Sequence, residues 1–184
     1  AIDSEVDMNE SISALEAKIE DLKKETYGNL SRWEKLCSNI HKAKESIDIG
    51  VVGKYVELPD SYLSVTEAIK HAAANNSSQV NIKWIDSDNL SSNNINNLGE
   101  LSGIVVPGGF GERGISGMIE AAKFCREYKL PYLGLCLGMQ IMVIEFSKNV
   151  LNLSDANSTE FDSETSNPVI DIIESQKGLE ETGG

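Results

Sequence analysis

The sequence has 184 residues and a formal net charge of −13, with 40% apolar and 24% charged residues, which suits about one globular domain with a hydrophobic core. The charge balance argues against a nucleic-acid partner, because no basic stripe is present to neutralise phosphates. A membrane partner is not expected either, because no apolar run approaches the roughly 18 residues of a membrane-spanning helix.

Residues 1–28 are acidic and polar, and their apolar residues are spaced as on one face of a helix: Ile12, Leu15, Ile19 and Leu22. This spacing predicts one exposed amphipathic helix, a linker or docking helix, because four apolar positions are too few for a coiled coil. Gly28-Asn29 predicts a break, followed by a second helix that ends near Lys44. We therefore interpret residues 1–46 as a helical linker that leads into the domain.

From residue 47 the apolar pattern alternates between strand and helix periods. Strands are predicted at 47–53, 79–85, 102–106 and 131–135, and helices at about 61–74, 115–128 and 137–150. A Ser/Asn-rich stretch at 86–99 is predicted to be a solvated loop. This order of elements predicts an α/β fold of the flavodoxin-like three-layer type, with a parallel sheet and helices on both faces.

The stretch 131–140 joins the last strand to a helix through a turn that has a glycine on each side of Cys136. Tyr132, Leu133 and Leu135 are expected to be buried in the strand. The apolar face of the following helix is expected to consist of Ile141, Met142, Ile144 and Val150.

Cys136 is a candidate nucleophile. On a strand-to-helix turn, backbone N–H groups and the positive end of the helix dipole lower the pKa of a thiol, and the same geometry exposes the side chain above the sheet. The alternative is a buried structural cysteine, which is the usual place of a free cysteine.

A second glycine-rich turn, residues 107–114, follows the third predicted strand. Its spacing does not fit a dinucleotide fingerprint, and it lacks the Lys-Ser/Thr pair of a P-loop. Ligands in parallel α/β folds bind beyond the carboxyl ends of the strands, so this turn and the Cys136 turn are expected to face one pocket. The N–H groups of Gly109 and Leu137 are then natural donors to the oxyanion of an acyl-transfer reaction. The alternative is a tight turn without a ligand.

The chain has three cysteines, Cys37, Cys125 and Cys136, with no framework spacing and no CxxC pair. This odd number favours a reducing, cytoplasmic compartment. The two histidines, His41 and His71, lie far from any plausible ligand cluster, so no metal site is expected.

The segment Gly134–Gln140 resembles the nucleophile motif of class I glutamine amidotransferases. Four further blocks, 52–64, 106–114, 155–161 and 168–171, resemble the glutaminase domain of the CTP synthase family, and so does the leading segment 32–34. The resemblance covers about residues 47–184, which we interpret as the N-terminal part of that amidotransferase domain.

The resemblance implies a role for each matching residue. Cys136 would attack the side-chain amide of glutamine, form a glutamyl thioester and release ammonia. Gly109 and Leu137 would stabilise the oxyanion. The bound glutamine would be held by Gly109, Leu137, Gly138, Met139, Gln140 and Glu160, with Gln140 and Glu160 at its amino-acid end. Phe110 is a possible contact for GTP or glutamine.

The resemblance also implies partners outside this domain. Ammonia would pass to a synthetase domain that uses ATP with Mg to convert UTP into CTP, and GTP would activate the glutaminase. No cofactor is expected in the domain itself. The parent enzyme would be a cytoplasmic homotetramer, whereas this piece alone would be a monomer.

The sequence departs from the family in one respect. The catalytic histidine and glutamate of the family lie in a downstream His-Pro-Glu motif, and neither His41 nor His71 matches it. The chain is therefore expected to be a truncated glutaminase domain. One alternative is a binding or assembly module of the same fold that lacks the general base. Another, a glutaminase that serves a different acceptor, is disfavoured by the blocks at 52–64 and 155–161.

Overall fold

A computed structural model describes residues 2–43, 45–91 and 93–173. The described residues form two compact units, one within residues 1–45 and 72–79 and the other within residues 46–71 and 80–184. The predicted boundary between a helical linker, residues 1–46, and the domain that follows it stays a prediction. The elements, in chain order, are α1 (Ile2–Lys42), β1 (Glu45–Gly53), η1 (Pro59–Tyr62), α2 (Leu63–Asn75), β2 (Ser78–Asp86), η2 (Ile95–Glu100), β3 (Gly103–Val106), α3 (Ile115–Tyr128), β4 (Tyr132–Gly134), α4 (Leu137–Asn149), β5 (Asn157–Ser158) and β6 (Pro168–Ile170).

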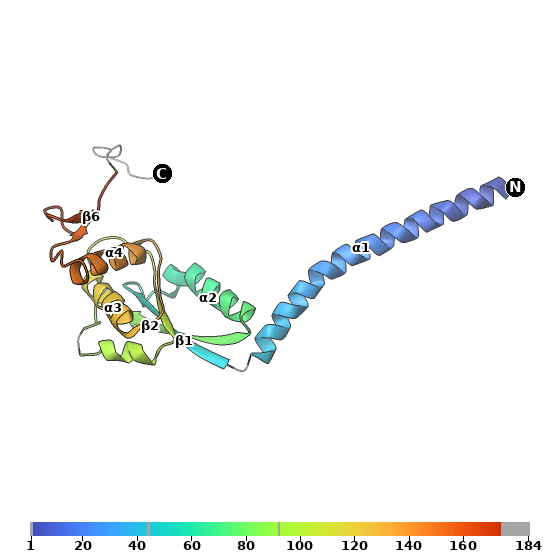
Figure 1. Ribbon diagram of the computed structural model, residues 1–184. Helices are drawn as coiled ribbons and strands as arrows, with labels where there is room; N and C mark the ends of the chain where they lie inside the picture. Colours follow the sequence, from blue (N-terminus) through green and yellow to red (C-terminus); the bar gives the residue numbers. More distant parts are fainter. Residues whose placement is uncertain (1, 44, 92, 174–184) are drawn as a thin grey trace. The chain divides into compact units, whose positions relative to one another are not determined.

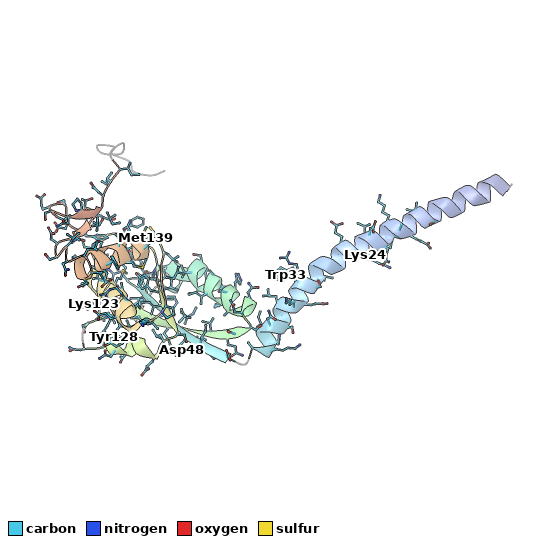
Figure 2. The ribbon with its side chains drawn as sticks, in the orientation of Figure 1. Lys24, Trp33, Asp48, Lys123, Tyr128 and Met139 are labelled. Carbon is cyan, nitrogen blue, oxygen red and sulfur yellow. The ribbon has the colours of Figure 1, made fainter. Side chains whose placement is uncertain are left out.

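The first unit is dominated by α1, a single helix of 41 residues (Figure 1). The predicted break at Gly28-Asn29 is wrong. Glycine and asparagine each weaken a helix by only about 1 kcal/mol or less, and good helix formers on both sides outweigh that cost. The predicted exposure of residues 1–28 is confirmed at Ile19 and Leu22, whose side chains are exposed. Trp33, further along α1, is also exposed and projects from the helix (Figure 2). No helix in the described part of the chain is long and apolar enough to cross a membrane.

The second unit contains a four-stranded sheet with the order β2-β1-β3-β4. The pairs β1–β3 and β3–β4 are parallel, with Val51 beside Val105 and Val105 beside Leu133. All four strands were expected, and each begins or ends within a few residues of its predicted bounds. The parallel α/β class predicted from the sequence is confirmed, and the carboxyl ends of β1, β3 and β4 lie at one edge of the sheet.

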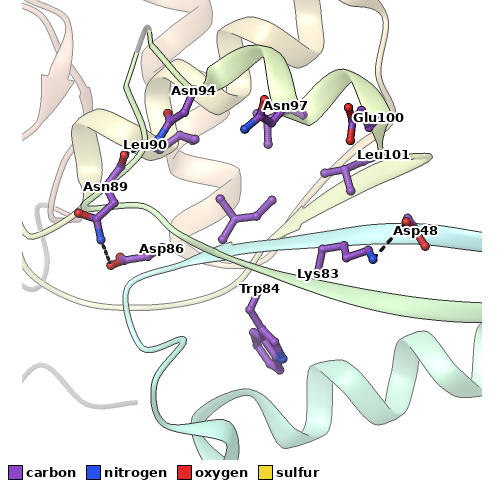
Figure 3. Close-up of a pocket in the computed structure, with 12 residues that line it drawn as sticks. Asp48, Lys83, Trp84, Asp86, Asn89, Leu90, Asn94, Asn97, Glu100 and Leu101 are labelled. Atoms are coloured by element: carbon purple, nitrogen blue, oxygen red, sulfur yellow. Dashed lines mark hydrogen bonds and ion pairs between the residues drawn. The ribbon is translucent and has the colours of Figure 1, made fainter.

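Elements cover both faces of this sheet. Alternate residues of a strand point to opposite faces, and Ile104 and Val106 point into the main core with α3, η2 and α4. That core contains Val52, Leu98, Ile104, Val106, Ile115, Met118, Ala121, Ala122, Phe124, Cys125, Leu137 and Ile141. On the opposite face, the Trp84 ring stacks on Tyr62 of η1, with 6.1 Å between ring centroids, and points toward the start of α2 (Figure 3).

Three local expectations are wrong. The segment 86–99 is not only a solvated loop, because η2 begins within it and Leu98 is buried in the core. Leu133 is 55% exposed, because it lies beside Val105 on the face opposite the main core and belongs to the last strand in the order. Met142 and Val150 are also exposed, so the buried face of α4 is narrower than its pattern indicates.

Candidate active site

Cys136 lies on a sharp turn between β4 and α4, as predicted. Its φ of 51° and ψ of −105° place a non-glycine residue in a sparsely populated, strained conformation. The thiol is exposed, so the alternative of a buried structural cysteine is wrong for this residue. A strained, exposed cysteine directly before a helix is the geometry of a nucleophile elbow.

The two glycines of the turn are required by close backbone packing. A Cβ atom on Gly138 would lie 2.0 Å from the carbonyl oxygen of Val106, and one on Gly134 would lie 2.4 Å from the carbonyl carbon of Gly138. The Tyr132 hydroxyl donates a hydrogen bond of 2.7 Å to the Gly138 carbonyl. The first turn of α4 is thus pressed against β3 and β4, and this packing fixes the position of Cys136.

The backbone N–H groups beside Cys136 are not all used by the turn's own hydrogen bonds. The turn's own hydrogen bonds use the N–H groups of Leu135, Gly138, Met139 and Gln140. Within the described part of the chain, the N–H groups of Leu137 and Gly109 donate no hydrogen bond. Unsatisfied N–H groups at a helix start favour an anionic oxygen.

The turn 107–114 lies against the Cys136 turn, as expected from the shared edge of the sheet. A Cβ atom on Gly108 would lie 3.5 Å from the Cβ atom of Cys136, and one on Gly109 would lie 3.2 Å from Leu137 Cδ2. The structure therefore brings Gly109, Cys136 and Leu137 together, which are the three residues that the sequence assigned to acyl transfer.

Two side chains from distant segments, Lys54 and Glu160, bind the backbone of this glycine turn, and Arg113 of the turn itself bonds outward. Lys54 Nζ donates to the carbonyl oxygens of Phe110 and Gly111, each at 2.7 Å. A carboxylate oxygen of Glu160 accepts a hydrogen bond of 3.0 Å from the Gly111 N–H group. Arg113 forms an ion pair of 2.8 Å with Asp88, and its guanidinium also donates to the carbonyl of Lys54.

Glu160 belongs to a segment that is held together by local hydrogen bonds and by the pairing of two short strands. Its N–H group donates to the Ser158 hydroxyl at 3.2 Å, and β5 pairs in parallel with β6. Hydrogen bonds from Ser166 and Asn167 hold the pKa of Asp155 below its usual range. The side chain of the predicted site residue Glu160 therefore contacts the glycine turn, and the hydrogen bonds of its own segment fix its position.

The other predicted binding residues lie on the same turns. Met139 and Gln140 are in the first turn of α4, and Met139 is exposed (Figure 2). Phe110 is 79% exposed on the glycine turn. Lys54 was not predicted to be a site residue. The feature of the sequence that could have indicated such a role is the position of this lysine directly after a buried strand.

The remaining cysteines and both histidines belong to other elements. Burial raises the pKa of the Cys125 thiol to about 12, so this thiol is a core group and not a nucleophile. Cys37 is exposed on α1, where its carbonyl lies 2.7 Å from His41 Nδ1. His71 is on α2. The described residues contain no group of three or more His, Cys, Asp or Glu side chains arranged to hold a metal ion.

A pocket of about 450 Å³ lies between β2 and η2, and its lining includes an ion pair of 3.4 Å between Lys83 and Asp48 (Figure 3). None of the predicted site residues lines it. A smaller pocket of about 190 Å³ has Lys54, Tyr55 and Arg113 in its lining and adjoins the glycine turn. The predicted site residues therefore lie at the two turns and not in the larger pocket.

Comparison with known proteins gives consistent results. The sequence model of the family described as "Glutamine amidotransferase class-I" matches residues 57–177. Two similar curated proteins are a CTP synthase of Hydrogenobaculum sp. (strain Y04AAS1), 51% identical over 85% of this chain, and a CTP synthase of Methanocaldococcus jannaschii, 48% identical over 85%. The chain spans only 29% and 30% of their lengths.

One similar solved structure is described as Trypanosoma brucei CTPS, glutaminase domain with bound acivicin. It is 37% identical in sequence, with a TM-score of 0.70, and the match covers 74% of this chain and 54% of that one. The resemblance deduced from the sequence motifs is confirmed by these comparisons.

Proposed function

The chain belongs to the class I glutamine amidotransferase family, and from that premise we propose that it is the glutaminase part of a CTP synthase. In this proposal it hydrolyses glutamine through a cysteine thioester. The observation that carries the proposal is the strained, exposed Cys136 beside the two free N–H groups of Gly109 and Leu137. A nucleophile and an oxyanion site in contact are the minimum that acyl transfer requires.

The proposed reaction has two stages. The Cys136 sulfur attacks the side-chain amide carbon of glutamine, and the N–H groups of Gly109 and Leu137 bind the oxygen that becomes negative. The C–N bond then breaks, ammonia takes a proton as it leaves, and a glutamyl thioester remains. Water attacks the thioester, the C–S bond breaks, and glutamate leaves with the thiol restored.

Thiolate formation needs a proton acceptor, and we assign none among the described residues. Both histidines of the sequence lie outside a His-Pro-Glu motif. In the proposal, the base and its partner glutamate come from another part of the parent polypeptide. Nucleophile and base act as a unit, so turnover requires both.

The proposed binding site uses the residues around the two turns. The carboxylate of Glu160 suits the α-ammonium group of glutamine, and Gln140 lies in the same helix turn as Gly138 and Met139. Phe110, exposed on the glycine turn, is the proposed contact for GTP or glutamine. No cofactor acts in this domain.

The proposal extends to the parent enzyme. Ammonia passes to a synthetase domain that uses ATP with Mg to convert UTP into CTP, and GTP activates the glutaminase. The parent is a cytoplasmic homotetramer, and free cysteines in the described part of the chain are compatible with that reducing compartment.

The direct test is glutamate release from glutamine by the full-length protein. We expect Cys136-dependent release over many turnovers. A folded full-length protein that binds glutamine without releasing glutamate would contradict the proposal and favour the alternative, a binding or assembly module that lacks the base.

Glu160→Gln is expected to raise the KM for glutamine by about 10- to 100-fold, because it removes a charge-assisted contact worth roughly 1.5–3 kcal/mol. The amide oxygen of the new side chain can still accept the hydrogen bond from Gly111, so the turn stays in place. Steady-state kinetics of the full-length enzyme measure the change. An unchanged KM would exclude Glu160 from substrate binding.

A further inference from the structure

We propose that Lys54 is a positioning residue of the oxyanion site: its ammonium group binds the Phe110 and Gly111 carbonyls and thereby holds the Gly109 N–H group beside Cys136. This inference rests on the proposed glutaminase function and adds a residue for which that function supplies no role.

The geometry of Lys54 is unusual for a lysine. Its residue is only 3% exposed, whereas lysine is almost never fully buried unless its charge is paired. It directly follows β1, and Nζ lies 2.7 Å from each of two successive carbonyl oxygens of the glycine turn. Two hydrogen bonds from one cation to neighbouring carbonyls fix the orientation of both peptide groups.

These carbonyls are the ones that follow the proposed oxyanion donor. A Cβ atom on Gly109 would lie 3.1 Å from Lys54 Cε and 3.9 Å from Nζ. The lysine stem thus forms one wall of the donor's site, and Leu137 forms another. A shift of the turn at Phe110 would move the Gly109 N–H group directly, because only one peptide group separates them.

The surroundings lower the pKa of Lys54, and the nearby charges act on it in both directions. Burial lowers the pKa of Lys54, and Arg113 lowers it further, while Glu160 and Asp88 act in the opposite direction. Glu160 also binds the turn through Gly111. The glycine turn, which has few side chains of its own to hold it, is therefore fixed by a cation on its carbonyl side and by a carboxylate on an N–H group.

The test is Lys54→Met in the full-length enzyme, which keeps the approximate shape of the side chain and removes both hydrogen bonds. We expect kcat for glutamine hydrolysis to fall about 100-fold, the effect of a small misplacement of a catalytic group. The KM for glutamine should change by less than about threefold, because binding uses other groups. CTP synthesis from added ammonia should be unchanged, which also shows that the protein is folded.

Two further variants sharpen the test. Lys54→Arg restores a cation that can donate to both carbonyls. Its kcat should be at least about tenfold higher than that of Lys54→Met. Lys70→Met is the matched control, because Lys70 is exposed and its ion pair with Glu67 lies on the surface of α2; its kcat should equal that of the wild type. If Lys54→Met does not fold, Lys54→Leu, which also lacks a hydrogen-bond donor, takes its place under the same criteria.

Three results would overturn the inference. The first is a Lys54→Met enzyme with kcat within about threefold of the wild type. The second is a parallel loss of glutamine-dependent and ammonia-dependent synthesis, which would show a structural role only. The third is a Lys54→Arg enzyme no better than Lys54→Met. A wild-type enzyme that releases no glutamate would instead overturn the proposed function, and this inference with it.

Discussion

Cys136→Ala is expected to lower glutamine-dependent CTP synthesis by the full-length enzyme at least about 1,000-fold, because removal of a nucleophile eliminates the covalent pathway. The side chain is exposed and the backbone turn is held by other residues, so the fold should be retained. CTP synthesis from added ammonia should therefore continue at the wild-type rate. Parallel assays with glutamine and with ammonium chloride measure the two activities.

The matched control for this variant is Cys37→Ala, because Cys37 is the other exposed thiol in the described part of the chain. It should leave both activities unchanged. If Cys136→Ala abolished both activities in a folded enzyme, the division between ammonia production and ammonia use would be wrong. If it left glutamine hydrolysis intact, Cys136 would not be the nucleophile.

Gly138→Ala is expected to destabilise the protein by about 3 kcal/mol, the upper end of the usual cost of overpacking. The added methyl group would lie 2.0 Å from the Val106 carbonyl oxygen, and both the start of α4 and β3 are backbone elements that cannot rotate away. For a domain of this size, such a loss lowers the Tm by roughly 6–12 °C. Thermal denaturation followed by circular dichroism measures it.

Gly99→Ala is the control for Gly138→Ala, because its added methyl group would meet only Phe124, at an ordinary distance of 3.6 Å. Its Tm should stay within about 3 °C of the wild type. An equal Tm for the Gly138→Ala and wild-type proteins would contradict the packing described for the Cys136 turn. Loss of glutaminase activity without loss of stability would show that the turn can move and that its position alone matters.

The sheet could be predicted from the sequence because its strands are short apolar runs with turn residues between them. The prediction failed where local composition and tertiary packing disagree. The Ser/Asn-rich segment 86–99 contains Leu98, and burial of that one side chain in the core helps to hold η2 in place. At Gly28-Asn29 the failure is the reverse: two weak helix formers are not enough to end a long helix.

The central parts of the site, Cys136 and the glycine turns, could be predicted because each is a local pattern with a physical reason. The structure adds that Gly134 and Gly138 are required by contacts below 3 Å, which the spacing alone does not reveal. The role of Lys54 could not be predicted, because its partner carbonyls lie 56 and 57 residues away in the sequence. Arg113 and Asp88 are likewise joined only by the fold.

The most direct measurement is the mass of the full-length enzyme after it has been mixed with glutamine and quenched in acid during turnover. A thioester mechanism predicts a mass increase of one glutamyl group, located by peptide mapping on the fragment that contains Cys136 and absent from Cys136→Ala. Glutamate release at the wild-type rate with no adduct on that fragment under any quench time would contradict the account.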